Sequence, residues 1–73
     1  MLTIQQLKSI YADIYNFNQI WCEKKLITDE EWQTILDDGN VILKKHTGSE
    51  FCKEMLVSVI SELNRNVGGK YEV

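Results

Sequence analysis

Thr28-Asp29-Glu30-Glu31 and Thr47-Gly48-Ser49-Glu50 are the two stretches that decide the fold of this 73-residue chain. In each, a threonine is followed three positions later by a glutamate, and an apolar run with helical spacing comes next. This order is typical of a capping box: the threonine oxygen accepts a hydrogen bond from the glutamate amide, and the glutamate side chain accepts one from the threonine amide. The two stretches therefore predict two helix starts and divide the chain into three helices.

The first predicted helix covers residues 3–25 and carries one continuous apolar stripe. Thr3 is its expected N-cap, and the stripe advances by three or four residues at each step. The members of the stripe are Leu7, Ile10, Ile14, Phe17 and Trp21. Tyr11 and Tyr15 flank the stripe, where a large ring with a polar tip suits the edge of a buried surface.

The second and third predicted helices cover residues 29–45 and 50–66, and each has one apolar face. The second has an acidic start and a basic end, which complement the helix dipole. Gly39 falls within its apolar face, where glycine costs about 1 kcal/mol relative to alanine and suggests close approach of a neighbouring helix or ring. Gly68 and Gly69 supply the left-handed conformation that commonly ends a helix.

Short connections between these helices predict an all-α domain, an up-down-up three-helix bundle formed by residues 1–67. Residues 68–73 are expected to form a flexible C-terminal tail. The first helix is the longest, at about 34 Å against about 25 Å for the other two. Two explanations are open: a bend near residues 16–18, or an apolar stripe that extends past the bundle and is covered by another chain.

Composition and charge restrict the class of protein. Hydrophobic residues make up 44% of the chain and charged residues 26%, which is typical of a folded domain. The net charge of −3 disfavours nucleic acid and anionic membranes as partners, because both attract basic surfaces. No apolar run approaches roughly 18 residues, the length of a membrane span, and no signal peptide is recognisable, so we expect a cytoplasmic protein.

Candidate catalytic and metal-binding residues are few. Cys22, Cys52 and His46 are the only soft metal ligands, and they lack the closely spaced pairs of a zinc site. A cysteine nucleophile needs a histidine base and an orienting group, and His46 is better explained as a cation at a helix C-terminus. We therefore expect no metal, no cofactor, no small-molecule substrate and no enzymatic activity, and we interpret both cysteines as buried, reduced thiols.

An acidic segment gives a second kind of candidate site. Five acidic residues lie within ten positions, with no basic residue among them: Asp29, Glu30, Glu31, Asp37 and Asp38. The helix dipole accounts for the first three, since they open a helix. Asp37 and Asp38 either belong to a solvated helix face or form a docking patch for a basic partner.

The leading functional hypothesis is a non-enzymatic helical module that binds proteins, either by forming a homodimer or by docking to another protein. Its expected anchors are Tyr11, Tyr15 and Trp21, because aromatic rings dominate interface energies. The alternative is a small regulatory protein, either a helical DNA-binding transcription regulator or an inhibitor that uses Asp37 and Asp38 against a basic partner. Short acidic helical chains are common among accessory proteins of bacteria and their phages, an association that rests on no particular residue.

Overall fold

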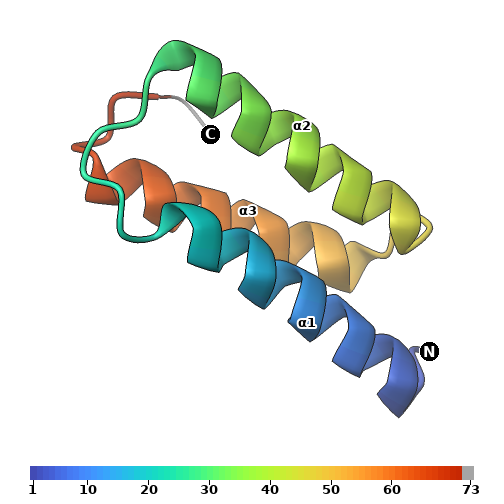
Figure 1. Ribbon diagram of the computed structural model, residues 1–73. Coiled ribbons are helices and arrows are strands. Elements are labelled where there is room, and N and C mark those ends of the chain that lie inside the picture. The colour runs from blue at the N-terminus through green and yellow to red at the C-terminus, as the bar shows by residue number, and fades with distance from the viewer. Residues whose placement is uncertain (72–73) are drawn as a thin grey trace.

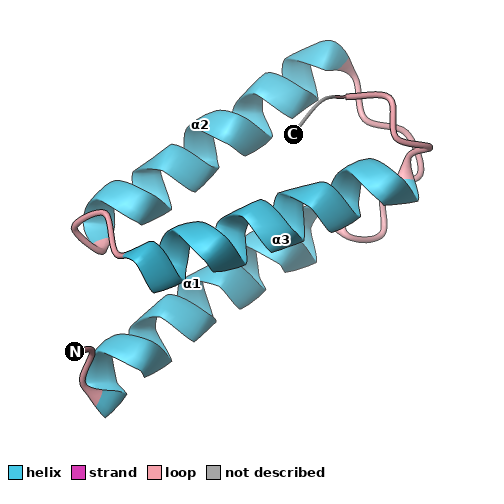
Figure 2. Cartoon of the chain, turned by 180° about the vertical axis from the view of Figure 1, so that it is seen from behind, coloured by secondary structure: helices cyan, strands magenta, loops and turns pink. Residues whose placement is uncertain are grey.

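The computed structural model describes residues 1–71 as three helices joined by short connections (Figure 1). Helix α1 covers Ile4–Trp21, α2 covers Asp29–Lys45 and α3 covers Glu50–Asn66. Each helix packs against both of the others. Helix α2 runs antiparallel to α1 and α3, which are parallel to each other (Figure 1 and Figure 2). The predicted all-α, up-down-up three-helix bundle is confirmed.

The first two helices begin at capping boxes, as the sequence predicts for Thr28 and, as an N-cap, for Thr3. Thr3 accepts a hydrogen bond from the Gln6 amide at 3.1 Å, and the Gln6 side chain accepts one from the Thr3 amide at 2.7 Å. Thr28 and Glu31 form the same pair of bonds, both at 3.1 Å. Each box satisfies amides that no intrahelical carbonyl can reach, and such a cap is worth about 1 kcal/mol.

The predicted capping box at Thr47 and Glu50 is wrong, although α3 does begin at Glu50. Ser49 is the N-cap, and its hydroxyl accepts a hydrogen bond from the Cys52 amide at 3.4 Å. Thr47 and Gly48 have φ angles of 56° and 70°. These two residues therefore form the left-handed turn that follows α2, and Thr47 is not free to cap α3.

Helix α1 ends at Trp21, before the predicted end at residue 25. Residues 22–28 form the connection to α2, and Ile27 within it is only 4% exposed. Ile27 precedes the Thr28 cap and Trp32 is the fourth residue of α2, the two positions that form a hydrophobic staple. Both side chains belong to the buried core.

The three helices are nearly equal in length, with 18 residues in α1 and 17 in each of the others. Helix α1 also runs without a break through residues 16–18. Because α1 is not much longer than the other helices, neither a bend nor a covering chain is needed to explain its length. The first turns of α1 still diverge from the turn between α2 and α3 (Figure 2). Ile4, in the first of these turns, is 70% exposed.

The core lies along the axis of the bundle and is apolar. Its buried members are Ile10, Ile14, Phe17, Trp21, Ile27, Trp32, Ile35, Cys52, Leu56, Ile60 and Leu63. The predicted stripe of the first helix is confirmed from Ile10 onward, whereas Leu7 is half-buried. Gly39 is buried, but a methyl group added there would meet the Ile60 side chain at 3.5 Å, an ordinary van der Waals distance. Close helix approach therefore does not require this glycine.

The C-terminal residues as far as Tyr71 fold back onto the bundle, in the region where the sequence predicts a flexible tail over residues 68–73. Gly68 and Gly69 have φ angles of 90° and 70° and end α3, as predicted. The Tyr71 ring then stacks on the Trp32 ring, with the centroids 4.5 Å apart. The aromatic surface of Trp32 holds the segment, and a pattern of glycines cannot reveal such a surface. Residues 72 and 73 of the predicted tail lie outside the described residues.

Candidate functional site

Two tyrosines are exposed on α1, and the first of them, Tyr11, contacts α3. Tyr11 is 51% exposed and Tyr15 is 66% exposed, on consecutive turns of the helix. The Tyr11 ring meets the Phe51 ring of α3 edge to face, with the centroids 5.7 Å apart, a favourable aromatic geometry. Tyr15 follows Tyr11 one turn later on the same side of α1.

A hollow of about 320 Å³ begins at Phe51 and follows the outer side of α3. Half-buried apolar side chains four residues apart line it, and Glu54 and Ser58 supply polar groups. Residues at this spacing lie on one stripe of a helix. We define the α1–α3 face as the surface formed by Tyr11, Tyr15, Phe51, Met55 and Val59. This face combines protruding rings with an adjoining hollow.

Trp21 does not join this surface. It is 8% exposed and belongs to the core, so it is not available as an interface anchor. The Lys24 ammonium lies 5.3 Å from the centre of the Trp21 ring. Its indole N–H has no hydrogen-bond acceptor among the described residues. The ring therefore stabilises the bundle by packing and offers no group to a partner.

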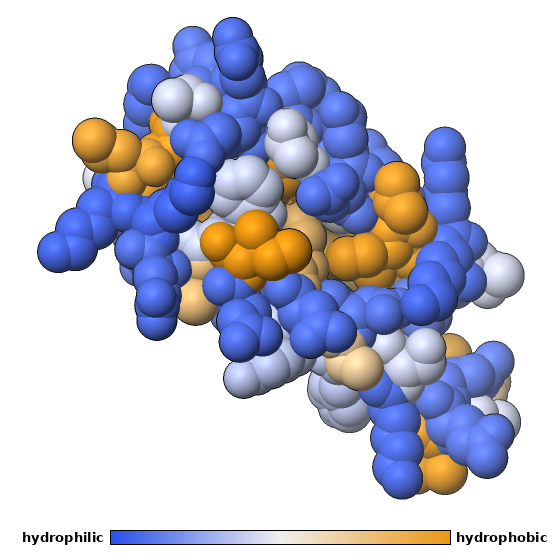
Figure 3. All heavy atoms as spheres, in the orientation of Figure 1, coloured by the Kyte–Doolittle hydropathy of each residue, from blue (hydrophilic) through white to orange (hydrophobic). Residues whose placement is uncertain are grey.

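Asp37 and Asp38 are exposed on α2. Asp37 accepts a hydrogen bond from the Gln33 side chain at 3.0 Å. Asp38 lines a shallow hollow of about 250 Å³ between α1 and α2, together with the exposed Ile20 and Val41. Figure 3 shows separate apolar patches between these two helices, surrounded by polar side chains. The structure thus brings the two tyrosines together and places Asp38 on a different face of the bundle.

Asp13 is the polar residue that sequence reasoning missed. Its carboxylate lies 2.7 Å from Nε2 of His46 and 2.9 Å from Nζ of Lys45, so it joins α1 to the end of α2. Burial raises the pKa of Asp13, but hydrogen bonds from Lys45 and His46 outweigh burial, and the pKa is lowered overall. The sequence does contain one signal for this role: Asp13 lies one turn from Ile10 and from Phe17, at the edge of the buried stripe of α1.

A polar hollow of about 390 Å³ opens beside His46, between the first turns of α1 and the end of α2. The His46 side chain is 10% exposed, and its Nε2 is engaged by Asp13. The nearby chain carries no activated thiol: burial raises the pKa of the Cys52 thiol, and the charge of Asp13 raises it further. A thiol of this kind is a poor nucleophile. Cys22 is exposed, which corrects the expectation that both thiols are buried.

Within residues 1–71, no group of three or more His, Cys, Asp or Glu side chains is arranged to hold a metal ion. None of the helices in this part of the chain combines the length and the apolar character that crossing a bilayer demands.

Exposed rings and a hollow meet on the α1–α3 face, whereas the ionisable side chains at Asp13, His46 and Lys45 pair with one another. Such exposed aromatic groups are the usual anchors of protein interfaces. No protein-family profile, curated protein or solved structure matches this chain.

Proposed function

We propose that this protein is a small, non-enzymatic helical module that binds proteins, and that it forms a homodimer through its α1–α3 face. The observation that carries the proposal is the exposure of Tyr11 and Tyr15 on α1, with the Tyr11 ring in contact with Phe51 at the hollow on α3. Tyrosine offers a large, rigid contact area with few rotatable bonds, so little entropy is lost on binding. We place the protein in the cytosol, where an exposed thiol such as that of Cys22 stays reduced.

A second copy of the chain is the partner that best fits this face. A two-fold symmetric interface joins the same patch on both copies, so the patch must be complementary to itself. The α1–α3 face has rings that protrude and a hollow of about 320 Å³ that can receive a side chain. Phe51, Met55 and Val59 are half-buried, and covering their remaining apolar area would contribute about 25 cal/mol per Å².

Sedimentation equilibrium of the full chain tests the proposal. We expect a dimer whose Kd rises at least about tenfold, or about 1.4 kcal/mol, when Tyr11→Ser and Tyr15→Ser are combined. Leu26→Ser combined with Val57→Ser is the matched control, because these side chains are 84% and 49% exposed and lie outside the α1–α3 face. A wild-type chain that stays monomeric at high concentration, or an equal loss in the control, would contradict the proposal.

The face that carries Asp38 favours a second candidate function, inhibition of a basic partner. Asp38 lies beside Ile20 and Val41, which are 64% and 65% exposed, so an apolar site has an acidic edge. A partner with an apolar side chain flanked by lysine or arginine matches this chemistry. If Asp37→Lys combined with Asp38→Lys leaves the capture of partner proteins unchanged, this candidate fails.

DNA recognition receives less support from the structure. A helix that enters the major groove lies close to the phosphates of the DNA backbone. Helix α3 begins with Glu50, and Glu54 follows one turn later; both are exposed. Two carboxylates at this position would repel the phosphates, so we do not extend the proposal to DNA.

A further inference from the structure

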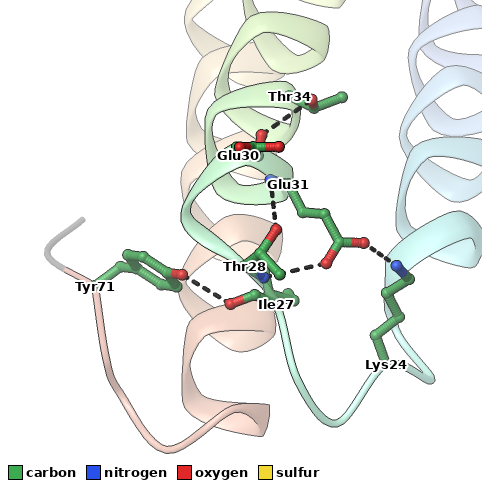
Figure 4. Close-up of polar contacts among 7 residues, drawn as sticks. All are labelled: Lys24, Ile27, Thr28, Glu30, Glu31, Thr34 and Tyr71. Atoms are coloured by element: carbon green, nitrogen blue, oxygen red, sulfur yellow. Dashed lines mark hydrogen bonds and ion pairs between the residues drawn. The ribbon is translucent and has the colours of Figure 1, made fainter.

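The Tyr71 side chain lies against the start of α2, with its hydroxyl directed at the Ile27 carbonyl (Figure 4), and we call the set of residues that contact it the slot. The Tyr71 ring stacks on the Trp32 ring, with the centroids 4.5 Å apart and the planes within 6° of parallel. The Tyr71 hydroxyl donates a hydrogen bond to the Ile27 carbonyl at 2.7 Å and lies 2.9 Å from the Asp29 carboxylate. The slot therefore contacts both the flat face and the phenolic hydroxyl of a tyrosine.

Asn64 contacts the backbone of the same tyrosine. Asn64 is a buried polar residue, 8% exposed, near the end of α3. Its side-chain oxygen accepts a hydrogen bond from the Tyr71 amide at 2.8 Å, and its side-chain nitrogen donates one to the Tyr71 carbonyl at 2.5 Å. These two bonds satisfy a buried amide group that would otherwise be costly to remove from water.

The residue before the tyrosine is recognised by charge. The Lys70 ammonium lies 3.3 Å from the Asp29 carboxylate, which is also the group beside the Tyr71 hydroxyl. A basic residue followed by a tyrosine thus matches both contacts of Asp29. Gly68 and Gly69 connect α3 to this pair and are exposed, so the pair can leave the slot without unwinding a helix.

We propose that the Tyr71 slot, formed by Ile27, Asp29, Trp32 and Asn64, is a recognition site for a tyrosine-bearing peptide segment. In the isolated chain, Lys70-Tyr71 occupies the slot as an intramolecular ligand. An extended segment of another protein that carries lysine and tyrosine in the same order takes its place when it binds. This inference is independent of the homodimer, because the slot uses none of the residues of the α1–α3 face.

Nuclear magnetic resonance of the full chain with Tyr71→Ala tests the inference. The peptide acetyl-Gly-Gly-Lys-Tyr-amide is added up to about 10 mM, a range that covers millimolar affinities. We follow the Trp32 indole N–H and the Asn64 side-chain amide, and we expect both signals to move until the site is saturated. The wild-type chain, in which Tyr71 fills the slot, is expected to bind the peptide at least about tenfold more weakly.

Two matched peptides separate recognition from non-specific contact. With phenylalanine in place of tyrosine, the peptide loses only its hydroxyl, and we expect binding about two- to tenfold weaker, the usual effect of one lost hydrogen bond. With alanine in that position, we expect no response. Equal responses to the tyrosine and alanine peptides, or no response in the Tyr71→Ala chain, would overturn the inference.

A second variant protects the test against loss of the fold. If circular dichroism shows that Tyr71→Ala has lost its helices, Tyr71→Leu takes its place, because leucine keeps an apolar side chain on Trp32. We expect the same ranking of peptide affinities: the tyrosine peptide binds more tightly than the phenylalanine peptide, and the alanine peptide gives no response. A different order in this variant would also overturn the inference.

Discussion

The two ends of the bundle are held together in different ways. At one end, which we call the closed end, the connection between α1 and α2 meets the end of α3 and the C-terminal segment (Figure 1). Ile27 and Trp32 are 4% and 8% exposed there, and Asn64 is bonded to the Tyr71 backbone. Figure 4 shows the Tyr71 hydroxyl and the Thr28 capping box side by side at this end. Its apolar contacts are buried. Its two ion pairs among the described residues, Lys24 with Glu31 and Lys70 with Asp29, are partly or largely exposed.

The opposite end, which we call the open end, depends on charge. Helix α1 is tied to the end of α2 by Asp13, whose side chain is 23% exposed, through Lys45 and His46. Beyond these ion pairs a hollow of about 390 Å³ separates the two helices, and Ile4 is exposed. Partly exposed ion pairs are weakened by salt, whereas buried apolar packing is not. Helices with similar caps and apolar stripes are therefore held together by different contacts at the two ends of the bundle.

The largest expected effect comes from Trp32→Ala at the closed end. Removing a buried tryptophan from a core costs about 3–5 kcal/mol of the free energy of unfolding, which approaches the whole stability of a small domain. Urea unfolding followed by circular dichroism measures the loss. Ile4→Ala at the open end is the matched control, with an expected change within about 0.5 kcal/mol. Similar losses in the two variants would break the comparison.

Asn64→Ala should have the next largest effect. It removes both side-chain bonds to the Tyr71 backbone, and we expect a loss of about 1–3 kcal/mol in the free energy of unfolding. Quenching of tryptophan fluorescence by acrylamide should increase as well, because Tyr71 no longer covers Trp32. The exposed Asn66→Ala serves as the control on the same helix. If quenching is unchanged in Asn64→Ala, the closed end does not depend on this residue.

At the open end, Asp13→Asn should cost about 1–2 kcal/mol at low salt and less at high salt. The pKa of Asp13 is lowered in the folded chain from its ordinary value of 3.8. The stability that this carboxylate contributes is therefore complete above its ordinary pKa and is lost as the pH falls through the lower, folded value. Stability of the wild-type chain should thus decrease in acid, and Asp13→Asn should show a smaller decrease.

Asp37→Asn is the control for that measurement, because Asp37 is exposed and bonded only to Gln33 among the described residues. Thermal unfolding over a series of pH values and salt concentrations compares the two variants with the wild-type chain. A salt-independent loss in Asp13→Asn, or an equal loss in Asp37→Asn, would show that charge does not hold the open end.

The smallest expected effect lies between the two ends. Gly39→Ala places a methyl group 3.5 Å from the Ile60 side chain, where it fits without displacement. Alanine also favours a helix over glycine, so we expect a gain of about 0.5–1 kcal/mol and a higher Tm by about 2–8 °C. Hydrogen exchange should slow at both ends alike, because only global unfolding is affected. A destabilised variant would show that Gly39 is needed for packing.

Much of the fold could be predicted from the sequence, because its signals act over one or two helical turns. Thr28 and Glu31 are three residues apart, and the stripe from Ile10 to Trp21 repeats every three or four residues. Such signals determined the three helices, the two confirmed caps and the core face of α1. They also identified Tyr11 and Tyr15 as large rings beside the stripe, and both are exposed in the structure.

Only the tertiary structure decided the features that depend on distant residues. Tyr71 reaches Ile27 and Trp32, and Asp13 reaches His46, across stretches of chain in which no local pattern marks the pairing. Capping and periodicity are properties of neighbouring residues. The choice of which polar group is buried and which ring is covered depends on how three helices pack. The sequence therefore determined the helices and their apolar faces, whereas packing decided the closed end, the open end and the slot that Tyr71 fills.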